Sequence, residues 1–143
     1  MKPRVAVGVC SAFILLAACT GGSGSSTTPS TASPASGPRP STTATLKILS
    51  PKNGQVVHGS TVDLKVSLTG AKLVAVSSTN LVPNEGHLHV SVDDTLISMT
   101  SGLQQTIPNL TPGTHLVTVE FVANDHFPFD PRVRALVSFQ VKP

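Results

Sequence analysis

The sequence contains no tryptophan and no tyrosine, and only five of its 143 residues are phenylalanine. Four of these five lie between Phe121 and Phe139. Surfaces that stack sugars or single-stranded nucleic acids depend on exposed aromatic rings. The scarcity of such rings argues against a binding surface of that kind.

Cysteine and charged residues are also scarce. Cys10 and Cys19 are the only cysteines, and Cys10 lies in an N-terminal apolar segment that we expect to be removed, so no disulfide is predicted in the mature domain. The formal net charge is +3, but Lys2 and Arg4 belong to the same segment. Without them eight basic residues face seven acidic ones, a balance that predicts no nucleic-acid partner.

Several catalytic signatures are missing as well. The sequence has no G-x-S-x-G elbow, no glycine-rich phosphate loop, no H-E-x-x-H and no C-x-x-C. These motifs are typical of serine hydrolases, nucleotide-binding enzymes, zinc proteases and thiol oxidoreductases, so their absence argues against these four classes of enzyme. We therefore expect a protein that is not an enzyme.

The N-terminus has the parts of a secretory signal. Lys2 and Arg4 precede an apolar run of 14 residues that ends at Ala18, which is too short for a membrane-spanning helix. The run closes with Leu16-Ala17-Ala18-Cys19, which resembles a bacterial lipobox. The resemblance implies that residues 1–18 are a signal peptide, that Cys19 is acylated, and that the protein is anchored in the cell membrane on its extracytoplasmic side. The alternative is an ordinary cleaved signal in which Cys19 is incidental.

The next segment has the composition of a linker. Residues 20–45 consist of Gly, Ser, Thr, Pro and Ala, with Arg39 as the single exception. Such a segment buries too little apolar surface to offset the entropy of ordering it. We predict that residues 19–45, including the lipidated cysteine, form a disordered tether with a span of roughly 25–30 Å.

The remaining residues, 46–143, show the period of β-strands. Apolar residues alternate with polar ones along four segments, and turn-forming pairs such as Thr69-Gly70 and Pro112-Gly113 separate them. Shorter candidate strands are Leu46–Leu49, Lys72–Ser77, Thr95–Met99 and Gln104–Ile107. The four main segments are 61–68, 87–92, 117–121 and 133–141. About seven to nine short strands in one all-β domain predict an immunoglobulin-like β-sandwich.

A resemblance to bacterial Ig-like modules supports this fold. Residues 50–62, Ser-Pro-Lys-Asn-Gly and then Val-His-Gly-Ser-Thr-Val, resemble the first hairpin of such modules. Gly86-His87-Leu88-His89, Pro112-Gly113-Thr114-His115 and Asp125-His126 resemble the G-H-x-H, P-G-x-H and D-H motifs of a group of uncharacterised secreted bacterial domains. The resemblance covers essentially all of residues 46–143 and implies no established activity.

The histidines are the constellation that points to chemistry. His87 and His89 are two residues apart on a predicted strand, so both side chains leave the same face, opposite Leu88 and Val90. Such a pair suits zinc or copper, which needs a third ligand, and His126 is our choice. His115, Glu85, Asp93 and Asp125 are the other candidates for this ligand. A solvated face or a hydrogen-bonded polar cluster is the alternative.

The metal hypothesis carries two expectations about solution behaviour. Imidazoles must be neutral to bind a metal, so binding should weaken as the pH falls through the range near ~6.5. Copper(II) should bind more tightly than the other divalent ions.

The phase of His115 favours another role. His115 is in phase with Val117, Val119 and Phe121, which favours a position in the core or at a corner. There its ring would replace a corner tyrosine by bonding to the backbone. His58, beside Gly59, is expected to be exposed.

Two connections carry polar or aromatic residues. Asp93 and Asp94 follow a strand and are expected to form a turn into the next one. Phe127 and Phe129 lie in the last hairpin loop, where they cap the core or, alternatively, form an exposed recognition tip.

These observations leave two functions open. The first is a non-enzymatic, membrane-tethered binding or accessory module that engages a metal, a ligand or an envelope protein; we expect it to be a monomer. The second is a metal-dependent envelope enzyme built on His87, His89 and a third ligand. A purely structural domain is a third possibility.

Overall fold

A computed structural model describes residues 37–75 and 79–143. The predicted signal peptide, Cys19 and most of the predicted tether lie outside these residues, and so do residues 76–78 at the end of the expected strand Lys72–Ser77. Within the described part of the chain, no helix is long and apolar enough to cross a membrane.

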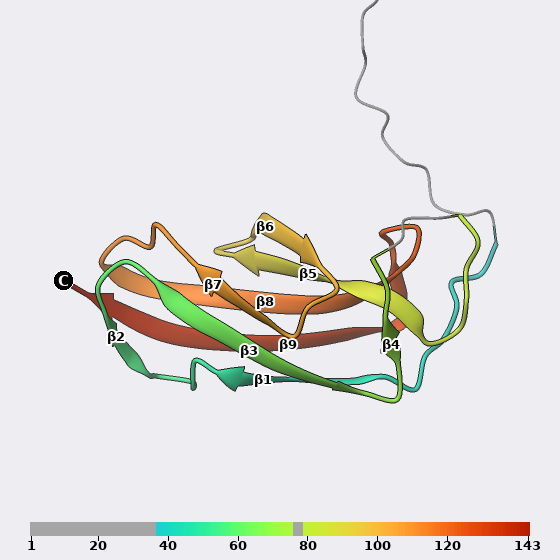
Figure 1. The fold of residues 1–143 in the computed structure, drawn as a ribbon, viewed down its shortest axis with the longest axis horizontal. Helices are drawn as coiled ribbons and strands as arrows, with labels where there is room; N and C mark the ends of the chain where they lie inside the picture. Colours follow the sequence, from blue (N-terminus) through green and yellow to red (C-terminus); the bar gives the residue numbers. More distant parts are fainter. Residues whose placement is uncertain (1–36, 76–78) are drawn as a thin grey trace, which may run out of the picture. The chain divides into compact units, whose positions relative to one another are not determined.

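The described residues form an immunoglobulin-like sandwich of two β-sheets (Figure 1). The smaller sheet has the order β1-β3-β7, and its strands are Thr45–Ser50, Val62–Thr69 and Gln104–Ile107. The larger sheet has the order β2-β9-β8-β5-β4, with β6 pairing β5 as well. Its strands are β2 Val56–His58, β4 Lys72–Leu73, β5 Glu85–Val92, β6 Thr95–Thr100, β8 Gly113–Ala123 and β9 Pro128–Lys142.

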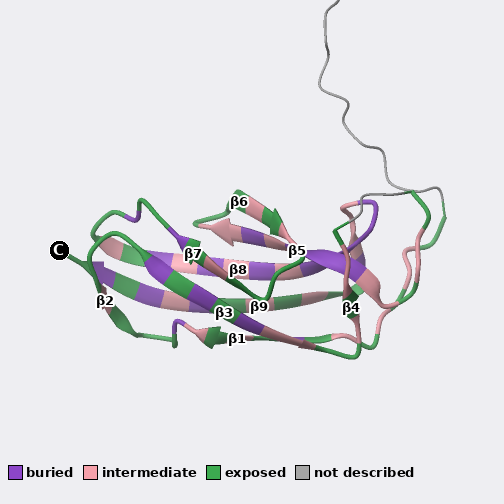
Figure 2. Cartoon of the chain, in the orientation of Figure 1, coloured by how far each residue is buried: buried purple, intermediate pink, exposed green. Residues whose placement is uncertain are grey.

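The core lies between the two sheets and follows the predicted alternation. Leu64 of β3, Leu88 of β5 and Val119 of β8 are all almost completely buried. Buried and exposed positions alternate along residues 62–66 of β3, and buried and intermediate positions alternate along residues 115–121 of β8 (Figure 2). The rings of Phe121 and Phe129 stack with centroids 5.1 Å apart. Each fully buried side chain of this size stabilises the fold by about 1.5–3 kcal/mol. The described residues contain no cysteine, so this apolar packing is the main source of their stability.

The strand phasing and the turns agree with the prediction. The expected strand Gln104–Ile107 has the same bounds as β7, whereas the expected strand Lys72–Ser77 is shorter, since β4 ends at Leu73. Asp93 and Asp94 form the two-residue turn between β5 and β6, with φ angles of 48° and 65°. Positive φ at both central positions is the conformation that a tight hairpin requires and that Asp tolerates.

The segment just before β1 contacts the folded domain. Residues 39–44, assigned to the tether from composition, contact the domain: the hydroxyl of Thr42 donates to Asn84 Oδ1 at 2.7 Å, and Arg39 binds the turn between β8 and β9. Contacts with the folded domain therefore extend to residues before position 46, mainly through polar side chains and backbone groups.

Candidate metal centre

Strand β5 places His87 and His89 on the outer face of the larger sheet. Leu88 lies between the two histidines and Val90 follows His89. Both are 1% exposed and pack in the core. Because side chains alternate along a strand, the two histidines point away from that core together. The expected phase of this strand is confirmed.

Gly86, immediately before His87, is required by a close approach of β8. A Cβ atom at this position would lie 1.9 Å from the carbonyl oxygen of Val122. Only glycine allows the two backbones to pair here, in the register that places Gly86 opposite Ala123 and His87 opposite Val122. The glycine of the G-H-x-H motif thus has a packing role.

The turn between β8 and β9 brings His126 over the same face. The amide of His126 donates to the carbonyl of Ala123 at 3.0 Å, and the amide of Ala123 donates to the carbonyl of Phe127 at 3.0 Å. His126 itself has φ of 67°, a conformation uncommon for a residue with a side chain. The turn therefore holds this ring in a fixed, somewhat strained backbone position.

Arg39 fixes this turn from outside and was not predicted as a functional residue. Its guanidinium donates to both carboxylate oxygens of Asp125, at 2.6 and 2.9 Å, and to the carbonyls of Phe127 and Pro128 at 3.0 and 2.8 Å. These bonds surround His126 in the sequence. The available signal was that Arg39 is the one charged residue in the segment 20–45.

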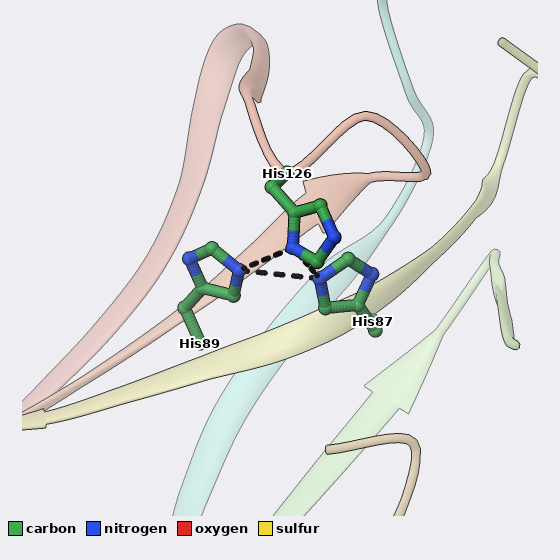
Figure 3. A group of neighbouring side chains, drawn as sticks. All are labelled: His87, His89 and His126. Atoms are coloured by element: carbon green, nitrogen blue, oxygen red, sulfur yellow. Dashed lines mark hydrogen bonds between the residues drawn. The ribbon is translucent and has the colours of Figure 1, made fainter. Parts of the chain in front are cut away.

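Three ring nitrogens converge at the centre of the site (Figure 3). Nε2 of His87 lies 3.1 Å from Nε2 of His89 and 3.0 Å from Nδ1 of His126. The third separation, between His89 Nε2 and His126 Nδ1, is 3.4 Å. His87 is buried and the other two histidines are partly buried. We call these three residues the histidine triad.

Hydrogen bonds alone do not satisfy the triad. A hydrogen bond needs a proton on one nitrogen and a lone pair on the other. Three nitrogens in mutual contact cannot alternate between these two states. For any choice of tautomers, at least two of the three ring nitrogens therefore point either two lone pairs or two N–H groups at each other. A cation at the centre removes this conflict, because all three nitrogens then point lone pairs at it.

The separations fit a transition metal. An imidazole–zinc bond is about 2.0–2.1 Å long, so two nitrogens on one ion lie roughly 2.9 Å apart at a right angle and roughly 3.4 Å apart at a tetrahedral angle. All three observed separations lie within this interval. The triad can thus supply three ligands without rearrangement and leaves a further coordination position for another ligand.

The environment keeps two of the rings neutral. Desolvation, followed by repulsion from His126 and His89, lowers the pKa of His87 from 6.5 to about 4. Desolvation and His126 also lower the pKa of His89, although the Glu120 carboxylate opposes this shift. For His87 the range in which protons compete with a metal therefore moves from near 6.5, as expected from sequence, to about 4.

The other ligand candidates are engaged elsewhere. Asp125 is bound by Arg39, and Glu85 pairs with Lys72 at 3.1 Å. Asp93 contacts His115, with Oδ2 2.7 Å from Nδ1. The structure brings His126, and none of these three carboxylates, into the group with His87 and His89.

His115 has the structural role that its phase predicted. It is 8% exposed, and its Nε2 lies 2.8 Å from the carbonyl oxygen of Thr111. Both ring nitrogens therefore face oxygen acceptors, which favours the doubly protonated ring. These two hydrogen bonds raise the pKa of His115, the bond to the Thr111 carbonyl contributing most.

The remaining sequence expectations concern His58 and the last hairpin. His58 is exposed, as expected, with Nδ1 3.2 Å from the carbonyl oxygen of Pro143. Phe129 is 1% exposed and caps the core. Phe127 is only partly buried and lies under the Arg39 guanidinium, 5.8 Å from it. The interpretation of this loop as a cap holds fully for Phe129.

Comparisons with known proteins bear on the fold alone. No family model matches the chain, and no curated protein matches its sequence. Among solved structures, the chain is similar to the fibronectin(III)-like modules of Clostridium thermocellum CbhA, with 20% identity and a TM-score of 0.48 over 68% of this chain and 94% of that one. The PKD domain of human KIAA0319 is 16% identical with a TM-score of 0.45, over 78% and 91% of the two chains. An endo-beta-1,4-mannanase from Thermotoga petrophila is 17% identical with a TM-score of 0.46, over 69% of this chain and 20% of that one.

Proposed function

We propose that this chain is a lipid-anchored extracytoplasmic protein whose Ig-like domain binds a transition-metal ion, copper or zinc, through His87, His89 and His126. The observation that carries the metal site is the contact of three imidazole nitrogens, which tautomers cannot satisfy and a cation can. The location rests on the sequence, where Leu16-Ala17-Ala18-Cys19 supports acylation of Cys19.

The donor set determines which metals are suitable. Imidazole nitrogen is a good ligand for zinc and copper, whereas magnesium and calcium prefer oxygen. For three nitrogens with no imposed geometry at the fourth position, copper(II) binds more tightly than zinc. The domain then serves as a binding or accessory module that holds the ion or presents it to an envelope protein.

A metal-dependent enzyme is the second candidate, and one observation favours it. Three protein ligands with a further open position are the arrangement of catalytic zinc sites. Such an enzyme also needs a base near the metal-bound water. The two carboxylates that flank the triad are already paired, Asp125 with Arg39 and Glu120 with Arg132. We therefore propose a binding function in preference to catalysis.

Calorimetric titration of the purified protein in detergent tests the metal site. We expect one equivalent of copper(II) or zinc to bind the wild type, with copper tighter. The changes His87→Ala, His89→Ala and His126→Ala should each abolish tight binding. The control is His58→Ala, which removes an exposed histidine that lies outside the triad and should leave binding unchanged. Equal binding by the wild type and the triad variants would refute the proposal.

A further inference from the structure

Met99 lies beside the triad on the same face of the sheet. It is directly opposite His89 in the antiparallel pair of β5 and β6. Residues opposite each other in such a pair project their side chains to the same face, with Cβ atoms about 4.5–5.5 Å apart. The side chain of Met99 therefore projects from the same face of the sheet as that of His89.

A cavity joins Met99 to the other two histidines. Its volume is about 410 Å³, and His87, His126 and Met99 are among the residues that line it. Met99 is also 54% exposed, so its side chain is accessible from solvent. The position gives the thioether access both to the triad and to solvent.

We propose that Met99 is a fourth ligand of the triad and makes the site one for copper(I). This inference rests on the proposed metal site and names the ion and oxidation state that the site favours. Thioether sulfur is a soft ligand that selects copper(I), and imidazole binds copper as well. Zinc and copper(II) use the three nitrogens together with oxygen ligands, and so gain little from a thioether.

The charge of the ion also favours copper(I). All four ligands are neutral when the histidines are unprotonated, so the site retains the full charge of the ion. A partly buried site that carries one positive charge is less costly than one that carries two. The nearest acidic group across the β5–β8 pair, Glu120, is already bound by Arg132 at 2.5 and 2.6 Å. The site therefore disfavours a divalent ion relative to copper(I).

Competition with a colorimetric copper(I) chelator under anaerobic, reducing conditions tests the proposal. The protein is the full chain in detergent, as the wild type, as Met99→Leu, which keeps size and apolarity but removes sulfur, and as Ile97→Leu. Ile97 is a comparably exposed residue of β6, at 43%, and provides the matched control. Loss of an outer partner of a metal ligand costs about 10–100-fold in affinity, and loss of a direct ligand should cost at least as much.

We expect Met99→Leu to weaken copper(I) binding by about tenfold or more and to leave the affinity for zinc unchanged. Ile97→Leu should bind both ions as the wild type does. X-ray absorption of the copper(I) protein should show a sulfur ligand that disappears in Met99→Leu. Equal copper(I) affinity in the wild type and Met99→Leu, with no sulfur signal, would overturn this inference and leave the triad intact. Failure of the wild type to bind either ion would instead refute the proposed function, and this inference with it.

Discussion

Arg39 and Asp125 form a two-bonded ion pair, at 2.6 and 2.9 Å, in which the Asp125 side chain is only 2% exposed. The pair joins the segment that follows the predicted tether to the turn that carries His126. The same guanidinium also binds the carbonyls of Phe127 and Pro128. The position of the third candidate ligand therefore depends on a residue 87 positions earlier in the chain.

Removing Arg39 should weaken both the fold and the metal site. Arg39→Ala removes the cation that binds both oxygens of the buried Asp125 carboxylate, and breaking a buried ion pair typically costs about 3–5 kcal/mol. We expect lower stability in urea and weaker copper binding, because the His126 turn loses its restraint. Arg39→Ala combined with Asp125→Asn should recover part of the stability.

The control for Arg39 is Lys72→Ala. Lys72 makes a surface ion pair with Glu85 and is 71% exposed, so its removal should change stability by less than about 1 kcal/mol. If Arg39→Ala bound copper as tightly as Lys72→Ala does, Arg39 would not position the ligand turn.

The metal-free protein should lose stability in mild acid because of His87. The pKa of His87 is about 4 in the folded protein and 6.5 without the fold, so the unfolded chain takes up the proton first. The contribution of neutral His87 to stability is therefore complete above pH 6.5. It is lost as the pH falls toward 4, which lowers the free energy of unfolding by on the order of 1–3 kcal/mol. Urea unfolding at several pH values should show this slope in the wild type and a smaller one in His87→Gln. Identical slopes would show that His87 is not protected from protonation.

The pair of His115 and Asp93 should give the opposite dependence on pH for its histidine. The pKa of His115 is raised in the folded protein. The contribution of His115 to the free energy of unfolding is therefore complete below pH 6.5 and is lost as the pH rises through the pKa of the folded state. The pKa of Asp93 is lowered, so its contribution is present above 3.8 and is lost as the pH falls through the folded value. The change His115→Gln should cost about 1–3 kcal/mol at pH 6 and leave metal binding unchanged. A loss of metal binding with unchanged stability would contradict these roles.

A charge at Val119 should unfold the domain. Val119 is fully buried in β8, so Val119→Asp places an unpaired carboxylate in the core, at a cost that exceeds about 4–5 kcal/mol. The control is Thr118→Asp, one residue earlier and on the other face, which should remain folded. Circular dichroism and urea unfolding measure both. A folded, stable Val119→Asp protein would show that the strand phase is wrong.

Cys19 should be required for membrane attachment. Acylation needs its thiol, so Cys19→Ser should be released or mislocalised while the wild type partitions into detergent. Phase separation with a mild detergent, followed by immunoblotting, distinguishes the two. Recovery of the wild type wholly in the aqueous phase would contradict lipidation.

The sequence determined the fold class because local alternation reports which face of each strand is buried. Leu88 and Val90 predicted the core face of β5, and the same period placed His87 and His89 together on the other face. The phase of His115 predicted its buried position and its bond to the backbone. In each case neighbours along one strand carry the information.

Tertiary structure alone decided the contacts between distant segments. The sequence suggested His126 among several possible third ligands, but the pairing of β5 with β8 and the turn after Ala123 bring its nitrogen to 3.0 Å from His87. Composition assigned Arg39 to a tether, because low apolarity says nothing about polar contacts made across 86 positions of the chain. Met99 became a candidate ligand only through its register opposite His89. Local periodicity fixes which face a side chain occupies, whereas the partners on that face depend on strand register and loop conformation, which are set by the packing of the whole domain.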